Sequence, residues 1–335
     1  MCRVLIPQSL QTLPHQLPIG ELHTLAGQSM GTTWTVRYVN TQMLSDGFVQ
    51  ALIQRELYLV VAQMSTWQQD SNISAFNRAD ANTWHVLPAG FFEVLDCALK
   101  IATETDGAFD PTIGALVNCW GFGSEGQRNS PPDIAEVKAL HAHCGWQKLT
   151  LEIEAMRAFQ PGNIYLDLSG IAKGYSVDRI GLALTKAGIE NYLIEVGGEL
   201  CGAGIKPDGQ PWWVALETSP AAEITTQSVV ALQGLAVATS GDYRRYFEHN
   251  GQHYAHTIDP RTGFPIDSTC NGLVSVSVLH AECMLADALA TAFTVMGVKT
   301  ALAYANQKDI AALFVVRTAA GVEEHLSAKL MAMLE

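Results

Sequence analysis

The stretch HTIDPRTGFP, residues 256–265, combines a histidine and an aspartate with the residues of a tight turn. Pro260 presets its own φ and Gly263 tolerates a positive φ, so we expect a rigid turn over residues 259–263. Just upstream, HNGQ at 249–252 separates two strand-like runs, and Asn-Gly in that position is typical of a β-hairpin. The pattern predicts two chain reversals with His256 at the end of a strand. On local grounds, a purely structural hairpin and turn is the alternative to a catalytic role.

A second segment, YLDLSGIAKGYSVDRIGLAL at 165–184, predicts a strand that leads directly into a helix. Ser169 is expected to N-cap a helix that begins near Ile171. Helix N-termini favour anions, and Lys173 in the first turn would add a mobile positive charge for a phosphate. Asp167 would repel a phosphate, which indicates a contact to a ring N–H, a hydroxyl or a divalent cation. A satisfied polar turn is the alternative.

A third segment, MLADALATAFTVM at 284–296, predicts a helix that is buried on most faces and ends at Gly297. It carries Asp287 in an apolar setting, where a lone carboxylate costs several kcal/mol unless it is paired or binds a metal. Thr291 lies one turn further on the same face, so the two side chains form half of an oxygen site suited to Mg²⁺. The alternative bonds Asp287 to a backbone N–H and Thr291 to its own helix.

These segments and six others follow one another in the order of a known family, and together they resemble the ApbE-type FAD:protein FMN transferases. The motifs are Met30-Gly31-Thr32, MSTWQQDSNISAFN at 64–77, GAFDPTIGALVNCWGFG at 107–123, LDLSGIAKGYSVD at 166–178, VGGEL at 196–200, KPDGQPW at 206–212, TSGDY at 239–243, HTIDPRTGFP at 256–265 and ADALAT at 286–291.

The resemblance implies a set of site residues. It implies FAD contacts from Met30, Trp67, Ala108, Phe109, Asp110, Asp167, Lys173 and Ile258, and a metal held by the carbonyl of Gly170 with Asp287 and Thr291. Trp67 takes a position where tyrosine is common in the family and would stack on the flavin ring.

The resemblance also implies the reaction, an Mg²⁺-dependent transfer of FMN from FAD to a threonine or serine hydroxyl of an acceptor protein, with release of AMP. Such an acceptor would be a flavin-carrying redox subunit. We assign the general base to His256, whose ordinary pKa of about 6.5 leaves it largely neutral near pH 7. Asp259 either orients His256 or locks the turn. An Mg²⁺-dependent FAD pyrophosphatase and a non-catalytic FAD-binding protein are the alternative functions.

The composition of the chain argues against some other classes of function. The 335-residue chain has a formal net charge of −13 and no basic cluster, which argues against nucleic-acid binding. An acidic protein that binds an anionic dinucleotide needs local positive charge, and a metal would supply it. His141, His143 and Cys144 lie on a polar segment and are interpreted as solvated surface rather than a metal cluster. Seven scattered cysteines predict reduced thiols.

The N-terminus departs from the family, many members of which begin with an export signal and a lipid-attached cysteine. Prolines at 7, 14 and 18 interrupt any apolar signal core, and no apolar run is long enough for a transmembrane helix. The chain as written is therefore expected in the cytoplasm. A truncated signal would instead place it in the periplasm or attach it to the inner membrane.

Strands and helices mix without a regular βαβ period, so we predict an α+β fold, ApbE-like, with largely antiparallel sheets and flanking helices. Residues 1–24 are expected to form a poorly ordered arm, and residues 25–335 a single domain. Helices are predicted at 47–65, 90–105 and 131–145, with another ending near 306; strands are predicted over a pair within 25–39 and at 149–153, 164–168, 192–196, 212–217, 272–279 and, last, 310–316.

Overall fold

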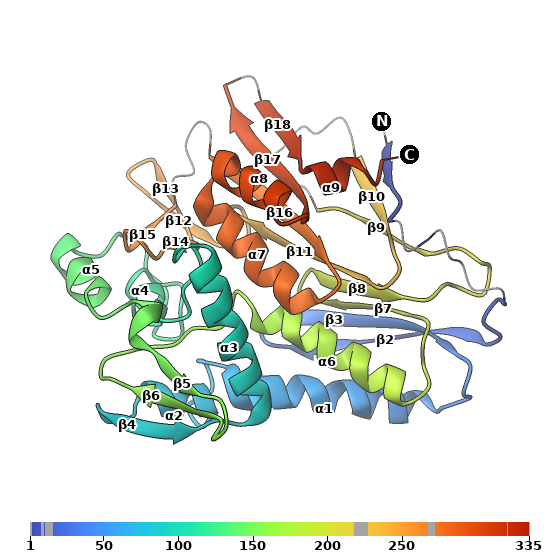
Figure 1. The fold of residues 1–335 in the computed structure, drawn as a ribbon, viewed down its shortest axis with the longest axis horizontal. Helices are drawn as coiled ribbons and strands as arrows, with labels where there is room; N and C mark the ends of the chain where they lie inside the picture. The colour runs from blue at the N-terminus through green and yellow to red at the C-terminus, as the bar shows by residue number, and fades with distance from the viewer. Residues whose placement is uncertain are drawn as a thin grey trace.

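The structure, a computed structural model, describes residues 2–7, 10, 16–217, 227–266, 272–319 and 321–334. The centre of this described part is an eight-stranded sheet (Figure 1). Its strands, in spatial order, are β18 (Gly321–Leu326), β17 (Ala311–Thr318), β16 (Leu273–His280), β11 (Leu235–Gly241), β8 (Glu199–Ala203), β7 (Tyr192–Val196), β3 (Thr32–Asn40) and β2 (Glu21–Ser29). Every neighbouring pair is antiparallel, which confirms the predicted α+β class.

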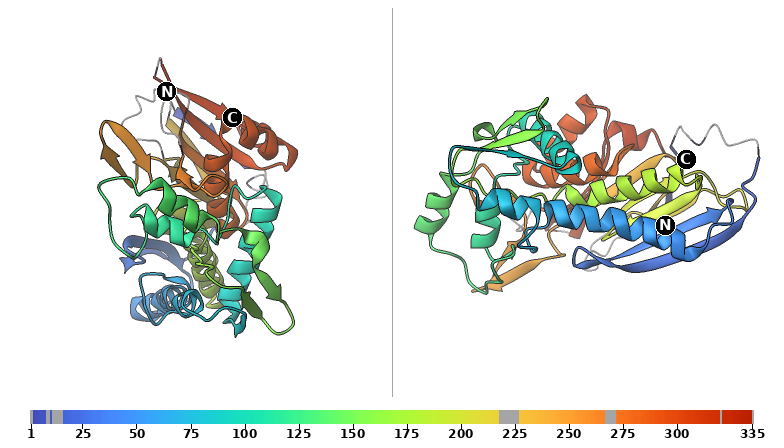
Figure 2. Two further views of the ribbon diagram at one scale, coloured as in Figure 1. Left: turned by 90° about the vertical axis from the view of Figure 1, so that its left-hand side faces the viewer. Right: turned by 90° about the horizontal axis from the view of Figure 1, so that it is seen from below.

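Long helices cover one face of this sheet. They are α1 (Asp46–Met64), α6 (Ala172–Lys186), α7 (Cys283–Met296) and α8 (Val298–Gln307), while α3 (Ala89–Glu104) packs against α1 and α7. α6 packs over β7 and β8, α7 packs over β11 and β16, and α1 lies along the outer side of α6 (Figure 2). Fully buried Val177 and Ile180 of α6 meet Ile194 of β7, so apolar burial holds this layer in place.

A three-stranded sheet covers part of the opposite face. It consists of β1 (Cys2–Leu5), β10 (Gln227–Leu232) and β9 (Trp212–Ala215), with β1 parallel to β10. Leu5 is fully buried there. The segment predicted as a poorly ordered arm therefore contains a paired strand, and its last residues begin β2 at Glu21. β1 has only four residues, which is too short a run to be recognised without its partner strand.

The smaller elements form the lobe on the left of Figure 1. They are α2 (Asn72–Asn77), β4 (Thr83–Val86), α4 (Gly114–Cys119), α5 (Ile134–His141), the 3₁₀ turn Trp146–Lys148, β5 (Thr150–Glu152) and β6 (Arg157–Gln160), with the hairpins β12 (Tyr246–His249)–β13 (Gln252–Ala255) and β14 (Ile258–Asp259)–β15 (Phe264–Pro265); α9 (Ala328–Met331) lies near the C-terminus.

Two strand predictions are wrong. Residues 164–168 form no strand apart from a single bridge of Tyr165 to Ile113, because the N–H of Leu166 donates to the Asn77 side chain at 2.7 Å instead of to a strand. The apolar run is an extended segment buried between other elements. The strand predicted to be last is followed by β18, whose alternation of polar residues hides its pairing.

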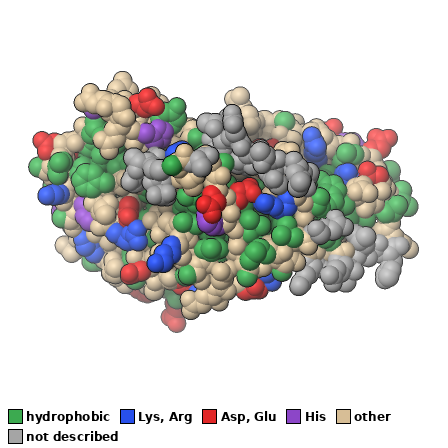
Figure 3. Space-filling view, turned by 90° about the horizontal axis from the view of Figure 1, so that it is seen from above, with side chains coloured by type: hydrophobic (Ala, Val, Ile, Leu, Met, Phe, Trp, Pro, Cys, Tyr) green, Lys and Arg blue, Asp and Glu red, His purple; other side chains and the backbone are tan. Residues whose placement is uncertain are grey.

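The surface and the helices agree with the composition. On the face shown in Figure 3, acidic, basic and apolar side chains are interspersed wherever residues are described. Among the described helices, none combines the length and the apolar character needed to cross a bilayer. Free thiols are found at Cys97, Cys119, Cys144, Cys201 and Cys283.

Candidate active site

Two adjoining cavities form a cleft between the central sheet and the smaller lobe. The His256 cavity has a volume of about 340 Å³ and the Trp67 cavity about 710 Å³. Both are lined by Met30, Gly31, Phe122, Asp167, Ser169, Lys173 and Arg245, so they are continuous. The His256 cavity is also lined by Ala108, Phe109, Asp110, Gly170, Ile258, Asp287 and Thr291, and the other by Trp67. The cleft thus brings together every residue that the sequence singled out for FAD, metal or base.

Close packing of α6 against α7 fixes one wall of the cleft. Asp178 of α6 accepts hydrogen bonds from the N–H groups of Cys283 and Met284, both at 2.8 Å, and so caps α7. A Cβ on Gly174 would lie 2.3 Å from the Cys283 carbonyl oxygen, so only glycine permits this approach. The N–H of Gly174 donates to Asp287 Oδ2 at 3.0 Å.

The predicted metal ligands lie together at this wall. Asp287 is 3% exposed, and Thr291 Oγ1 lies 3.1 Å from the position of a Cβ built on Gly170. Thr291 faces Ser240 Oγ at 3.3 Å rather than its own helix. The described residues contain no cluster of three or more His, Cys, Asp or Glu side chains suited to a metal. A carboxylate, a hydroxyl and a carbonyl nevertheless fit Mg²⁺, which takes one or two carboxylates and completes its shell with water and substrate phosphate.

Lys173 is not the mobile cation that the sequence predicts. Its Nζ lies 2.6 Å from Glu199 Oε1 and 3.6 Å from Asp287 Oδ1. Burial opposes the charge on Lys173, but the two carboxylates outweigh burial and raise its pKa. Glu199 is almost fully buried, and burial raises its pKa while Lys173 opposes the rise. The ammonium of Lys173 is therefore charged, held in place and already balanced.

His256 follows β13 and is held as a neutral base. Its Nδ1 lies 3.0 Å from the carbonyl oxygen of Arg245, which can only accept, so Nδ1 carries the proton and Nε2 the lone pair. Burial lowers the pKa of His256 to about 4; the hydrogen bond to the carbonyl opposes this fall, and nearby arginine and lysine cations add to it. The imidazole is thus more firmly neutral near pH 7 than its ordinary pKa implies.

The predicted hairpin and turn both form around His256. Asn250 and Gly251 have φ of 50° and 75°, as a type I′ turn requires. Asp259 accepts from the backbone N–H of Arg261 at 2.9 Å and from its guanidinium at 2.9 and 2.8 Å. Of the two roles considered for Asp259, the structure shows the locking of the turn.

His141 differs from its interpretation as solvated surface. Its Nε2 lies 2.8 Å from the Pro260 carbonyl oxygen, and its ring packs beside Gly263. The side chain is half-buried and supports the turn after His256 from outside. This contact joins segments more than a hundred residues apart, so no local pattern reveals it.

The start of α6 also differs from its prediction. The N-cap position is taken by Ile171, without any side-chain hydrogen bond. Ser169 instead donates from its backbone N–H and its hydroxyl to Asp167 Oδ1, at 2.7 and 2.5 Å. The carboxylate of Asp167 therefore shapes the turn at the junction of the two cavities.

Two further side chains of the cleft differ in their surroundings: Asp110 is held by hydrogen bonds, and Trp67 is largely exposed. Asp110 accepts from Thr112 N at 2.8 Å, Thr112 Oγ1 at 2.7 Å and Trp146 N at 3.0 Å, so its carboxylate braces the wall beside Phe109. Burial raises the pKa of Asp110, and these hydrogen bonds oppose the rise. Trp67 is 62% exposed at the edge of its cavity, which leaves the indole face free for stacking.

The sequence predicts no individual role for Glu199, Arg244 or Arg245. All three line the His256 cavity. The only signals for them are the VGGEL motif at 196–200 and the two arginines after SGDY. A Cβ on Gly198 would lie 2.6 Å from Arg244 Nη2, so the glycine in that motif makes room for the arginine.

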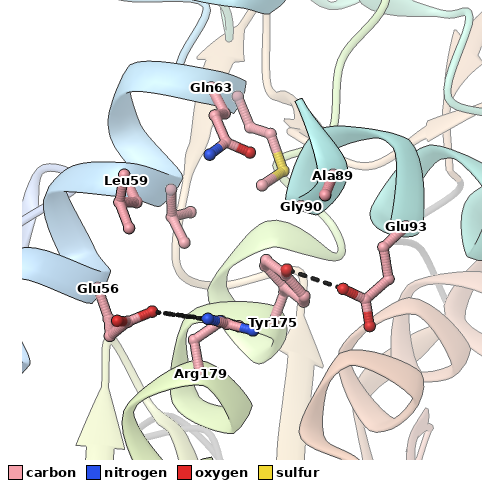
Figure 4. Close-up of a pocket in the computed structure, with 10 residues that line it drawn as sticks. Glu56, Leu59, Gln63, Ala89, Gly90, Glu93, Tyr175 and Arg179 are labelled. Atoms are coloured by element: carbon pink, nitrogen blue, oxygen red, sulfur yellow. Dashed lines mark hydrogen bonds and ion pairs between the residues drawn. The ribbon is translucent and has the colours of Figure 1, made fainter. Parts of the chain in front are cut away.

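A separate cavity of about 150 Å³ lies between α1, α3 and α6 (Figure 4). Arg179 donates to Glu56 Oε2 at 3.1 and 3.2 Å, and the Tyr175 hydroxyl donates to Glu93 at 3.0 Å. Several of its polar groups are therefore paired with one another.

The chain is similar to known proteins over most of its length. The curated FAD:protein FMN transferase of Vibrio cholerae is 40% identical over 311 residues, covering 92% of each chain, and that of Escherichia coli is 33% identical over 301 residues, covering 89% of this chain and 85% of the relative.

Among solved structures, the apo form of the Pseudomonas stutzeri flavinyl transferase ApbE is 35% identical, with a TM-score of 0.86 and coverage of 93% of this chain and 96% of that one. A histidine-to-glycine mutant of the flavin transferase ApbE from Vibrio cholerae is 38% identical, with a TM-score of 0.85 and coverage of 94% and 100%. The ApbE family model matches residues 30–314. The chain therefore belongs to the ApbE family.

Proposed function

We propose that this transferase moves FMN from FAD to a threonine or serine hydroxyl of an acceptor protein, with Mg²⁺ bound and AMP released. One observation carries the proposal: His256, whose Nε2 is unprotonated, lines the same cavity as Asp287 and Thr291, and that cavity adjoins the one that Trp67 lines. A base, a cation site and an aromatic platform are the parts that transfer from a flavin dinucleotide needs.

The transfer forms one phosphorus–oxygen bond and breaks another. The flavin stacks on Trp67, and the pyrophosphate extends into the His256 cavity. Nε2 of His256 takes the proton of the acceptor hydroxyl as its oxygen bonds to the FMN-side phosphorus. The bond from that phosphorus to the bridging oxygen breaks, and AMP leaves with the electron pair.

Asp287, Thr291 and the Gly170 carbonyl would hold the Mg²⁺, which when bound neutralises charge on the pyrophosphate. Lys173 keeps its place between Glu199 and Asp287 and thereby limits how much negative charge these carboxylates show to the substrate. The Asp167–Ser169 turn and the braced Asp110 wall orient the dinucleotide.

The test is to incubate the protein with FAD, Mg²⁺ and a flavin-carrying redox subunit that has an exposed threonine. AMP and a protein adduct with the mass of FMN should form in equal amounts, and a threonine-to-valine acceptor should give neither. AMP with free FMN in the absence of acceptor would identify a pyrophosphatase instead. FAD binding without AMP under either condition would identify a non-catalytic FAD-binding protein.

A further inference from the structure

The cleft contains three cationic side chains, and their partners differ. Lys173 is balanced by Glu199 and Asp287, as described above. Arg244 is ion-paired with Glu217 and also donates to the Gly197 carbonyl oxygen at 3.0 Å. Arg245 contacts no carboxylate in the part of the chain that the structure describes. Its positive charge is therefore available to an anion in the cleft.

The position of Arg245 joins the two cavities and the base. Its side chain lines both the His256 cavity and the Trp67 cavity. One guanidinium nitrogen, Nη2, donates to the Phe122 carbonyl oxygen at 2.9 Å, which anchors the group beside the cleft. The Arg245 carbonyl oxygen accepts from the backbone N–H of His256 and lies 3.0 Å from His256 Nδ1.

We propose that Arg245 is a further catalytic residue, which binds the pyrophosphate of FAD between the flavin-stacking and base-containing halves of the cleft. This inference rests on the proposed function. A guanidinium presents N–H donors in a fork that matches phosphate oxygens. When the bond to the leaving AMP breaks, negative charge grows on the bridging oxygen, and a fixed cation beside it stabilises that charge. The same residue orients His256 through its carbonyl, so base and phosphate are set relative to one another.

The experiment measures binding of FAD and of riboflavin, which lacks both phosphates, by quenching of flavin fluorescence in the presence of Mg²⁺. The variants are Arg245→Gln, Arg245→Lys and, as a matched control, Arg55→Gln, because Arg55 is 69% exposed on α1 and lines neither cavity of the cleft. Thermal melts establish that each variant is folded.

Arg245→Gln should weaken FAD about 10- to 100-fold, the range for a lost charge-assisted hydrogen bond, and should leave riboflavin within about twofold. Arg245→Lys should recover part of the loss, and Arg55→Gln should bind both like the parent. The salt dependence of FAD affinity should become shallower in Arg245→Gln, because one cation fewer meets the phosphates.

FAD affinity within twofold of the parent in Arg245→Gln would overturn the proposal. So would an equal loss for FAD and riboflavin with an unchanged salt dependence, since that would make Arg245 a support for the flavin wall. Failure of the parent protein to bind FAD would instead overturn the proposed function, so the two failures are distinguishable.

Discussion

At the scale of single residues, the environment of His256 decides how its chemistry depends on pH. Because burial lowers the pKa of His256 to about 4, its neutral form is present well below neutrality. Protonation removes the base as pH falls through the pKa of the folded protein. We therefore expect the rate of FMN transfer to be nearly constant between pH 6 and 8 and to fall only toward pH 4. A histidine with the ordinary pKa of about 6.5 would instead make the rate fall near that pH.

Replacing His256 with alanine should lower the rate of transfer by about 10²–10⁴-fold, the usual contribution of a general base. FAD affinity should change little, since a base acts on the transition state more than on the bound substrate. Single-turnover AMP release and FAD titration separate the two effects, and the acid limb should vanish in the variant. A parallel loss of binding and rate would make His256 a ligand contact.

The contribution of Trp67 to FAD binding also depends on a single side chain, because it comes from stacking on one ring. Trp67→Ala should weaken FAD by about 1–3 kcal/mol, the range for stacking of a base on an aromatic side chain. Trp67→Tyr serves as the control and should retain most of the affinity. Equal dissociation constants for the parent and the alanine variant would remove Trp67 from the site.

At the scale of elements, the contact between α6 and α7 holds the proposed metal ligands, Asp287 and Thr291, next to the turn at Gly170. Gly174 is the closest point of this contact, and the hydrogen bond from its N–H positions Asp287. The cap from Asp178 fixes the start of α7. Burial raises the pKa of Asp178 to about 6 despite these hydrogen bonds, so burying this charged carboxylate opposes part of the stabilisation that the cap provides.

Gly174→Ala should therefore destabilise the protein by at least about 1–3 kcal/mol, because its Cβ would meet backbone atoms that cannot turn away. Gly47→Ala in α1 is the matched control, since nothing lies within 4 Å of its Cβ, and it should be neutral or slightly stabilising. Urea unfolding measures both. Equal stability of the two variants would contradict the close packing of α6 on α7.

At the scale of the whole molecule, a chain with a net charge of −13 must bind an anionic substrate. We expect FAD to raise the melting temperature by several degrees when Mg²⁺ is present, since a ligand at 100 times its Kd stabilises by about 2.7 kcal/mol. EDTA should remove most of this shift. In Asp287→Asn the shift should no longer respond to Mg²⁺; a response equal to that of the parent would place the metal elsewhere.

Much of this was predictable because the signals are local. The Asn250-Gly251 turn, the locked turn from Asp259 to Gly263 and the end of α7 at Gly297 depend on residues that restrict φ or tolerate its positive values. The ordered motifs also identified the residues of the cleft. β1, β18 and the support of His141 were missed, since each depends on a partner far away in the chain.

The α+β class, the turns, the family and the residues expected to contact FAD, metal or acceptor could be predicted from the sequence, because periodicity, turn chemistry and motif order are properties of neighbouring residues. Only the tertiary structure decided how their charges are matched. Lys173 of α6 is balanced by Glu199 of β8, His256 is kept neutral by burial, and Arg245 has no carboxylate partner among the described residues. Burial and ion pairing depend on contacts between side chains that are far apart in the sequence, and these contacts form only in the folded protein.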